Sequence, residues 1–301
     1  MKKLMIAASA ALCAAVSMAV ESANVVGYNT VTLKAQKMAM IGVPFEGVGT
    51  AGGISVQDLV ATNGLTAAAA VANADQLWYY DPNEAGGYIK LYLYDSTLTS
   101  SAALQRKGKW LCAAKPTDTS WGTAGNAVST KILTPGMGLW LVRKDASTPL
   151  TLTFAGSVVV SEAGTKDIAI REGMNMIAGS FTTDFALNNV ASGASETDVD
   201  WLKKGCVGAA AIANADQIWF YDADESGGYV KTFLYDSTLT SSAAVQRKNH
   251  WLTGAKPTDT TWGTAGNAIT PKKIPAGRGF WYIRKSGAGA FTLTLDQPYT
   301  L

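Results

Sequence analysis

The segment ADQLWYYDPNEAGGYIKLYLYDSTLTSSAA, at Ala74–Ala103, returns at Ala215–Ala244 as ADQIWFYDADESGGYVKTFLYDSTLTSSAA. Self-similarity of this length at a fixed offset indicates that the chain contains two copies of one folding unit. Aromatic and β-branched residues run in short stretches between clusters of Asp, Asn and Gly, which is the pattern of strands joined by turns. The segment therefore predicts a duplicated β fold.

The same pattern extends outward through the first copy and predicts seven strands, all repeated in the second copy. Stretches such as LTLTF alternate apolar and polar residues, the period of a strand buried on one face. Short helices are expected at Ser55–Ala61, after a capping Ser, and in the Ala-rich run Thr66–Ala72. The expected strands are Val25–Leu33, Met38–Val43, Gln76–Tyr80, Tyr88–Tyr94, Lys109–Ala113, Gly138–Arg143 and Leu150–Phe154.

The predicted fold is all-β with minor helix, as two tandem antiparallel β-sandwich or small-barrel domains. We place their boundary between residues 155 and 156, so that copy one is 20–155 and copy two 156–301. Each unit has a comfortable size for a single core. Each also carries a long polar insertion, at about 95–130 and 236–271.

The first 19 residues, MKKLMIAASAALCAAVSMA, have the basic start, apolar run and small-residue end of a secretory signal peptide. We expect a secreted protein, located outside the cell or on its surface, with the periplasm as an alternative. Without Lys2 and Lys3 the 25 basic residues fall to 23, equal to the acidic ones. A nucleic-acid partner is therefore not expected, and no later segment has the length and apolarity of a membrane span.

Two cysteines follow the signal, Cys112 and Cys206. They do not occupy equivalent positions, because Cys112 aligns with Thr253 and Cys206 with Leu65. Neither copy holds a pair, so we expect two free and largely buried thiols rather than a disulfide.

The motifs G-x-N-x-I, V-W-x-Y-D, G-G-Y and P-G-x-G-x-W appear here as EGMNMI, DQIWFYD, GGYV and PAGRGFW, followed by FTLTL. In this order they resemble a tandem β module of secreted bacterial surface proteins, an uncharacterised family. The resemblance covers nearly all of copy two, whereas copy one has Lys37 in place of the early Gly. It implies a wall-associated β module. The glycines of P-G-x-G-x-W are interpreted as turn residues beside a packed Trp, because a strand follows where a dinucleotide fingerprint requires a helix.

Six aromatic residues lie in or beside the insertions among Ser, Thr, Asn and Gln. Flat rings surrounded by hydrogen-bonding groups suit a carbohydrate ligand, while packing in the core is the alternative interpretation. The candidate ligand-binding residues are Tyr94, Trp110, Trp121, Tyr235, Trp251 and Trp262.

The turns DPNEAGGY and DADESGGY place acids at alternate positions, as a calcium loop does, which gives weak calcium candidates at Asp81, Asn83, Asp222 and Asp224. Position twelve of such a loop should be Glu, but it is Tyr or Phe here. A hairpin turn is the alternative, and no other cofactor is expected. The single histidine, His250, aligns with a lysine, and no nucleophile motif is present. We therefore expect no enzyme, although repeated aspartates leave a glycosidase-like activity as the second alternative.

The polar block STLTSS is identical in both copies, while several apolar positions differ. Packing alone would preserve the apolar positions instead. Either a recent duplication homogenised this block, or both copies present the same surface to a partner. The sequence thus predicts a non-enzymatic structural or interaction protein that contacts a cell-surface component, a glycan or itself. A carbohydrate-binding protein is the first alternative.

Overall fold

The computed structural model describes residues 25–299 except 36, 49–51, 60–63, 114–115, 124, 146, 189–198, 255–257, 265 and 267. The expected signal peptide lies outside the described residues. Strands dominate, all described strand pairs are antiparallel, and the described sheets are open rather than closed into barrels. The all-β prediction is confirmed, with a sandwich-like arrangement in each copy.

Copy one contains a five-stranded sheet, a three-stranded sheet and a small two-stranded pair. The five-stranded sheet has the order β2 (Met38–Gly42), β9 (Gly138–Val142), β5 (Gln76–Tyr80), β6 (Tyr88–Leu93) and β7 (Trp110–Cys112). The three-stranded sheet has the order β1 (Val26–Leu33), β10 (Leu150–Val158) and β3 (Phe45–Glu46), and the small pair is β4 (Ile54–Ser55) with β8 (Ile132–Leu133).

Copy two repeats this topology, although its outer sheet has two strands in the described residues. Its five-stranded sheet has the order β12 (Gly173–Ala178), β18 (Gly279–Arg284), β14 (Gln217–Tyr221), β15 (Tyr229–Tyr235) and β16 (His250–Thr253). The other pairs are β11 (Thr165–Ile170) with β19 (Phe291–Asp296), and β13 (Phe185–Ala186) with β17 (Lys273–Ile274).

Each copy has its main core between its two larger sheets. In copy one, alternate residues of β10 such as Leu152 and Phe154 face Ile41, Leu77 and Leu139 of the five-stranded sheet, and all five are at most 1% exposed. The T-L-T-L strands thus bury every second residue and leave their threonines outside, as their alternation predicts.

Short helices fall at other places than expected. Helix α2 (Ser101–Arg106) and its counterpart α3 (Ser242–Arg247) form inside the polar insertions. Ser100 caps α2 by accepting a hydrogen bond from the Ala103 N–H at 3.4 Å. The expected helix Ser55–Ala61 is wrong in its described part, because residues 54–55 form β4 and residues 56–58 a turn. The expected helix Thr66–Ala72 is also wrong, because residues 66–70 are not helical. Within the described residues, single 3₁₀ turns add to α2 and α3, namely η1 (Val71–Asn73), η2 (Thr119–Trp121), η3 (Ile212–Asn214) and η4 (Thr260–Trp262).

Strand β10 runs across the boundary expected between the copies. Strand β10 continues to Val158 because Ala155 to Ser157 stay paired with β1. Val159 then joins the core of copy two. The expected boundary at 155/156 therefore falls inside the last strand of copy one.

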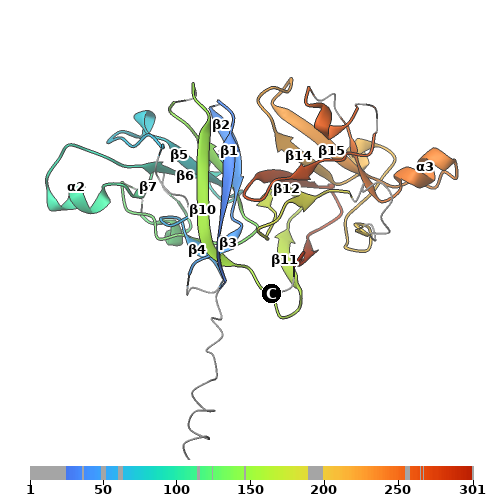
Figure 1. Ribbon diagram of the computed structural model, residues 1–301, viewed down its shortest axis with the longest axis horizontal. Coiled ribbons are helices and arrows are strands. Elements are labelled where there is room, and N and C mark those ends of the chain that lie inside the picture. Colours follow the sequence, from blue (N-terminus) through green and yellow to red (C-terminus); the bar gives the residue numbers. More distant parts are fainter. Residues whose placement is uncertain are drawn as a thin grey trace, which may run out of the picture.

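The two copies pack against each other through the outer faces of their five-stranded sheets (Figure 1). The contacts are reciprocal. The rings of Tyr80 and Trp281 meet edge to face with their centres 5.0 Å apart. The equivalent rings of Tyr221 and Trp140 meet in the same way, also with their centres 5.0 Å apart. The backbone repeats this symmetry, because Gly42 N–H donates to Gly277 O and Ala178 N–H to Gly136 O, both at 2.8 Å. The chain therefore builds a pseudo-two-fold dimer within one molecule.

The second glycine of each P-G-x-G-x-W motif lies at the closest approach of the two copies. A Cβ on Gly279 would lie 2.6 Å from Ile41 O, and one on Gly138 would lie 2.7 Å from Ile177 O. The first glycine of each motif has a positive φ, as expected of a turn. The interpretation of both as turn residues is therefore incomplete, because the second one permits the two copies to touch.

Both thiols are free and buried, as expected. Burial raises the pKa of Cys206 to about 12 and also raises that of Cys112. Within the described residues, no helix has the length and apolarity needed to cross a membrane.

Candidate functional site

The repeated polar block forms the two outer ends of the molecule. Helices α2 and α3 lie at opposite ends of its long axis (Figure 1). Residues 97–102 are all exposed, and so are the equivalent residues 238–243. Lys107 pairs with Asp95 at 3.2 Å, and Lys248 with Asp236 at 3.4 Å. Both ends thus present the same surface in the same conformation, facing away from each other.

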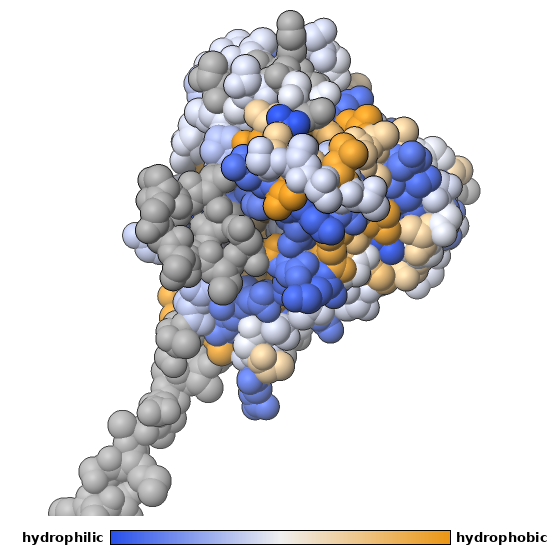
Figure 2. Space-filling view, turned by 90° about the vertical axis from the view of Figure 1, so that its right-hand side faces the viewer, coloured by the Kyte–Doolittle hydropathy of each residue, from blue (hydrophilic) through white to orange (hydrophobic). Residues whose placement is uncertain are grey.

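Each end exposes two large apolar side chains at equivalent positions. Leu98 is 63% and Leu104 57% exposed at one end, and Leu239 is 63% and Val245 59% exposed at the other. Figure 2 looks onto the copy-two end and shows hydrophobic areas set among hydrophilic ones. Single exposed apolar residues are ordinary. The same pair exposed twice is a feature that packing does not explain.

The six aromatic ligand candidates are all buried. Tyr94 and Tyr235 are 7% exposed, and the four tryptophans are at most 1% exposed. Trp121 stacks on Tyr79 at 5.2 Å, and Trp251 meets Trp201 edge to face at 5.8 Å. The rings fill the base of the insertions rather than present a face to solvent. The six rings therefore pack in the core, as the alternative interpretation predicted.

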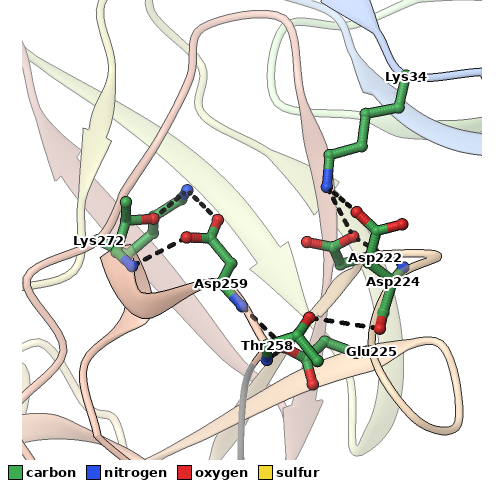
Figure 3. Close-up of polar contacts among 8 residues, drawn as sticks. Lys34, Asp222, Asp224, Glu225, Thr258, Asp259 and Lys272 are labelled. Carbon is green, nitrogen blue, oxygen red and sulfur yellow. Dashed lines mark hydrogen bonds and ion pairs between the residues drawn. The ribbon is translucent and has the colours of Figure 1, made fainter.

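The two acidic turns are closed by their own backbone. Asn83 N–H donates to the Asp81 carboxylate at 2.9 Å, and Asp224 N–H to Asp222 at 3.1 Å, which is the Asx-turn geometry of a hairpin. In copy two the Lys34 ammonium, from copy one, pairs with both carboxylates, at 3.3 Å for Asp222 (Figure 3). A protein cation therefore lies where the calcium hypothesis put a metal. In the described residues no three His, Cys, Asp or Glu side chains come together as a metal site.

A buried glutamate ties each acidic turn to its insertion. Glu225 is 6% exposed and accepts a hydrogen bond from Thr258 N–H (Figure 3). Glu84, 8% exposed, accepts the equivalent bond from Thr117 N–H. Both partners belong to the repeated KPTDT stretch. The preservation of that stretch thus has a structural reason in addition to any contact role.

The aspartate of KPTDT orders the next turn. Asp118 accepts from Ser120 N–H at 2.9 Å and pairs with Lys131 at 3.1 Å. Hydrogen bonding from Ser120, followed by the Lys131 charge, lowers the pKa of Asp118. Lys131 also lies 4.9 Å from the Trp121 ring centre. These groups stabilise one another at the wall of the insertion.

The repeated aspartates at the start of β5 and β14 are buried and hydrogen-bonded. Asp216, 0% exposed, accepts from Tyr282 Oη at 2.5 Å, Arg284 Nη1 at 2.8 Å and Lys285 N–H at 2.8 Å. Asp75, 1% exposed, accepts from Thr66 N–H at 2.9 Å. Neither carboxylate opens onto a described cleft, so neither suits the glycosidase-like alternative.

A cleft of about 490 Å³ opens between the two copies. The acidic turn after β5 and the residues before β9 form one wall, and β11 with the start of β12 forms the other. Its polar and aromatic lining comprises Tyr79, Tyr80, Asp81, Asn83, Lys131, Thr134, Asp167, Arg171 and Asn175. Neither copy could form this cleft alone.

No family model, curated protein or solved structure matches this chain. The chain's own geometry must therefore carry any assignment. Sequence reasoning missed the packing of the copies and the cleft it creates. The sequence did carry a signal for this packing. GLWLV and MAMI are apolar along their whole length, which is typical of strands that are covered on both faces.

Proposed function

We propose that this chain is a non-enzymatic, bivalent interaction protein that works outside the cell or at its surface. The observation that carries the proposal is the pair of equivalent outer ends, which expose Leu98 and Leu104 on one side and Leu239 and Val245 on the other. A molecule with two equal surfaces facing apart can link identical partners and gains avidity from the pair. The signal-like N-terminus and the resemblance to surface modules support the location.

Two properties of the body suit it to this role. The copies share a buried aromatic contact, so the ends are held at a fixed separation rather than on a flexible linker. Equivalent ion pairs stabilise the two outer ends, Lys107 with Asp95 and Lys248 with Asp236. Glu84 and Glu225 fasten the KPTDT stretches of the same insertions. A fixed geometry lowers the entropy lost on binding.

We propose further that the ends bind to each other, so that molecules join end to end. Light scattering after size exclusion, over a range of concentrations of the processed chain, tests this. The mass of the wild type should rise beyond a dimer. Leu98→Asp and Leu239→Asp should each stop growth at the dimer, because one end remains, and the double variant should stay monomeric.

The matched control is Val48→Asp, which replaces an apolar residue that is also 63% exposed but lies away from both ends. It should assemble like the wild type. A monomer at every concentration would contradict self-association. Loss of assembly in the control would show that added charge, rather than the ends, is responsible.

A further inference from the structure

The pseudo-two-fold arrangement creates two equivalent places where the acidic turn of one copy faces the outer sheet of the other. Lys34 follows β1, and Arg171 follows β11. The two residues are equivalent by register, because Leu33 pairs with Leu150 in one copy and Ile170 pairs with Phe291 in the other. The two places can therefore be compared residue by residue.

On one side the place is filled by the protein's own cations. Lys34 bridges Asp222 and Asp224 (Figure 3). Arg278 is partly buried, lies 5.1 Å from the Phe220 ring centre, and donates from Nε to Met40 O at 3.2 Å. Burial lowers the pKa of this guanidinium. These groups neutralise the turn and cover the aromatic ring.

On the other side Asp81 keeps the place of Asp222, but the groups around it are changed. Met137 replaces Arg278, Tyr79 replaces Phe220, and Asn83 replaces Asp224. Arg171 is exposed, and the described residues include no ion pair or side-chain hydrogen bond from its guanidinium. The result is the cleft of about 490 Å³, a size within the range of small-molecule sites.

The lining of this cleft selects for a neutral ligand. The lining holds two acids, Asp81 and Asp167, and two bases, Lys131 and Arg171, and Lys131 is also paired with Asp118. The cleft therefore carries no strong field of either sign. Tyr79 is half-buried with one ring face stacked on Trp121 at 5.2 Å, and burial raises the pKa of its hydroxyl. The hydroxyl is therefore protonated at neutral pH and can both donate and accept.

We propose that the open cleft between the copies binds a neutral glycan segment of about two sugar units. Arg171 donates hydrogen bonds to the sugar hydroxyls, Asp81 accepts them, and Tyr79 and Asn83 do both. Carboxylate, amide and guanidinium groups together offer the mixed acceptors and donors that vicinal hydroxyls require. Tyr79 and Tyr80, the aromatic residues of the lining, supply apolar contact. This site is independent of the outer ends, and it lies on different residues from the buried aromatic set.

Calorimetric titration of the processed chain with cellobiose, maltose and N,N′-diacetylchitobiose tests the proposal, with spermidine and citrate as charged probes. At least one disaccharide should bind, with one site per chain and more tightly than either charged probe. Met137→Arg should abolish that binding, because it places in this cleft the side chain that fills the other. Tyr79→Phe should weaken it by about tenfold, the effect of one hydrogen bond.

Phe220→Tyr is the matched control, since it makes the reciprocal change on the filled side and should leave affinity unchanged. Tyr79→Phe keeps the test valid if Met137→Arg does not fold, because copy two carries Phe at that position. The proposal is overturned if no disaccharide binds with a dissociation constant of about 10 mM or lower. It is also overturned if a charged probe binds more tightly, or if Tyr79→Phe leaves disaccharide affinity unchanged.

Discussion

Copies one and two share one backbone plan but satisfy the same buried aspartate in different ways. In copy two, Asp216 is paired with Arg284 at 2.8 Å and bonded by Tyr282. In copy one, Leu141 stands at the Tyr282 position, and Arg143 instead donates to Thr148 O at 2.6 Å. Asp75 keeps its backbone donor Thr66. The comparison teaches that backbone donors preserve this feature while the side chains around it diverge.

At the contact between the copies the side chains are preserved instead, because each residue must fit the surface of the other copy. The edge-to-face pairs Tyr80 with Trp281 and Tyr221 with Trp140 have the same 5.0 Å separation. A change in one copy alters a contact made to the other, so symmetric residues are constrained as pairs. The clefts beside this contact escape that constraint, and there Met137 and Asn83 of copy one replace Arg278 and Asp224 of copy two.

The largest expected effect comes from separating the copies. Gly279→Val should lower the free energy of unfolding by about 4 kcal/mol or more, because its Cβ would meet Ile41 O at 2.6 Å. Urea denaturation followed by Trp fluorescence measures this. Gly179→Val is the control, since the nearest atom to its Cβ, in Phe185, lies at an ordinary 3.4 Å. Equal losses in the two variants would refute the close-approach role of Gly279.

The two buried aspartates should respond differently to the loss of their neighbouring arginines. Arg284→Met should lower the free energy of unfolding by about 3 kcal/mol, because it leaves the Asp216 charge buried without its ion pair. Arg143→Met should cost about 1 kcal/mol, since it removes one hydrogen bond to a carbonyl. Urea unfolding of both variants measures the difference. A greater loss from Arg143→Met would contradict this account.

A smaller effect is expected from the ion pair that joins the copies. A hydrogen bond to Asp224, together with the charges of both aspartates, raises the pKa of Lys34 above 10.5. Its contribution is therefore complete below the unfolded pKa and is lost as pH rises through the higher folded pKa. Because Lys34 is 57% exposed, Lys34→Ala should cost only about 0.5 kcal/mol at low salt.

The measurement is the free energy of unfolding of wild type and Lys34→Ala between pH 7 and about 11, at low and high salt. The difference should vanish at high salt and should decrease toward the alkaline end, where the pH passes through the raised folded pKa. Lys109→Ala is the control for charge alone, since it removes an exposed lysine with no ion pair among the described residues. A constant difference at every pH would show that the ion pair is not its source.

The smallest expected difference is in the reactivity of Cys112 and Cys206, the two thiols that have no equivalent in the other copy. Because burial raises the pKa of both, neither should react with a thiol reagent in the folded protein at pH 8. Cys206, with its pKa at about 12, should be the slower of the two. Labelling followed by mass spectrometry measures the rates, and both thiols should react fully in urea. Rapid native labelling of Cys206 would contradict its burial.

Much of the fold could be predicted from local patterns. The seven strand positions of copy one are confirmed, with ends that differ mainly at β10, because β-branched and aromatic runs between turn residues carry their own signal. The helix α2 was missed, since STLTSSAALQR has no apolar periodicity and depends on the Ser100 cap. Of the candidate sites, the acidic segments form the hairpin turns of the alternative interpretation, and the six aromatic residues are buried.

The all-β class and the turns follow from the order of residues along a few neighbouring positions, and the duplication follows from comparing the chain with itself. Only the tertiary structure decided that the two sheets meet face to face, that Gly138 and Gly279 permit their contact, and that one cleft is filled while the other is open. These features join residues more than 100 positions apart, such as Lys34 and Asp222. No local pattern encodes such a distance, because it is set by packing between whole sheets.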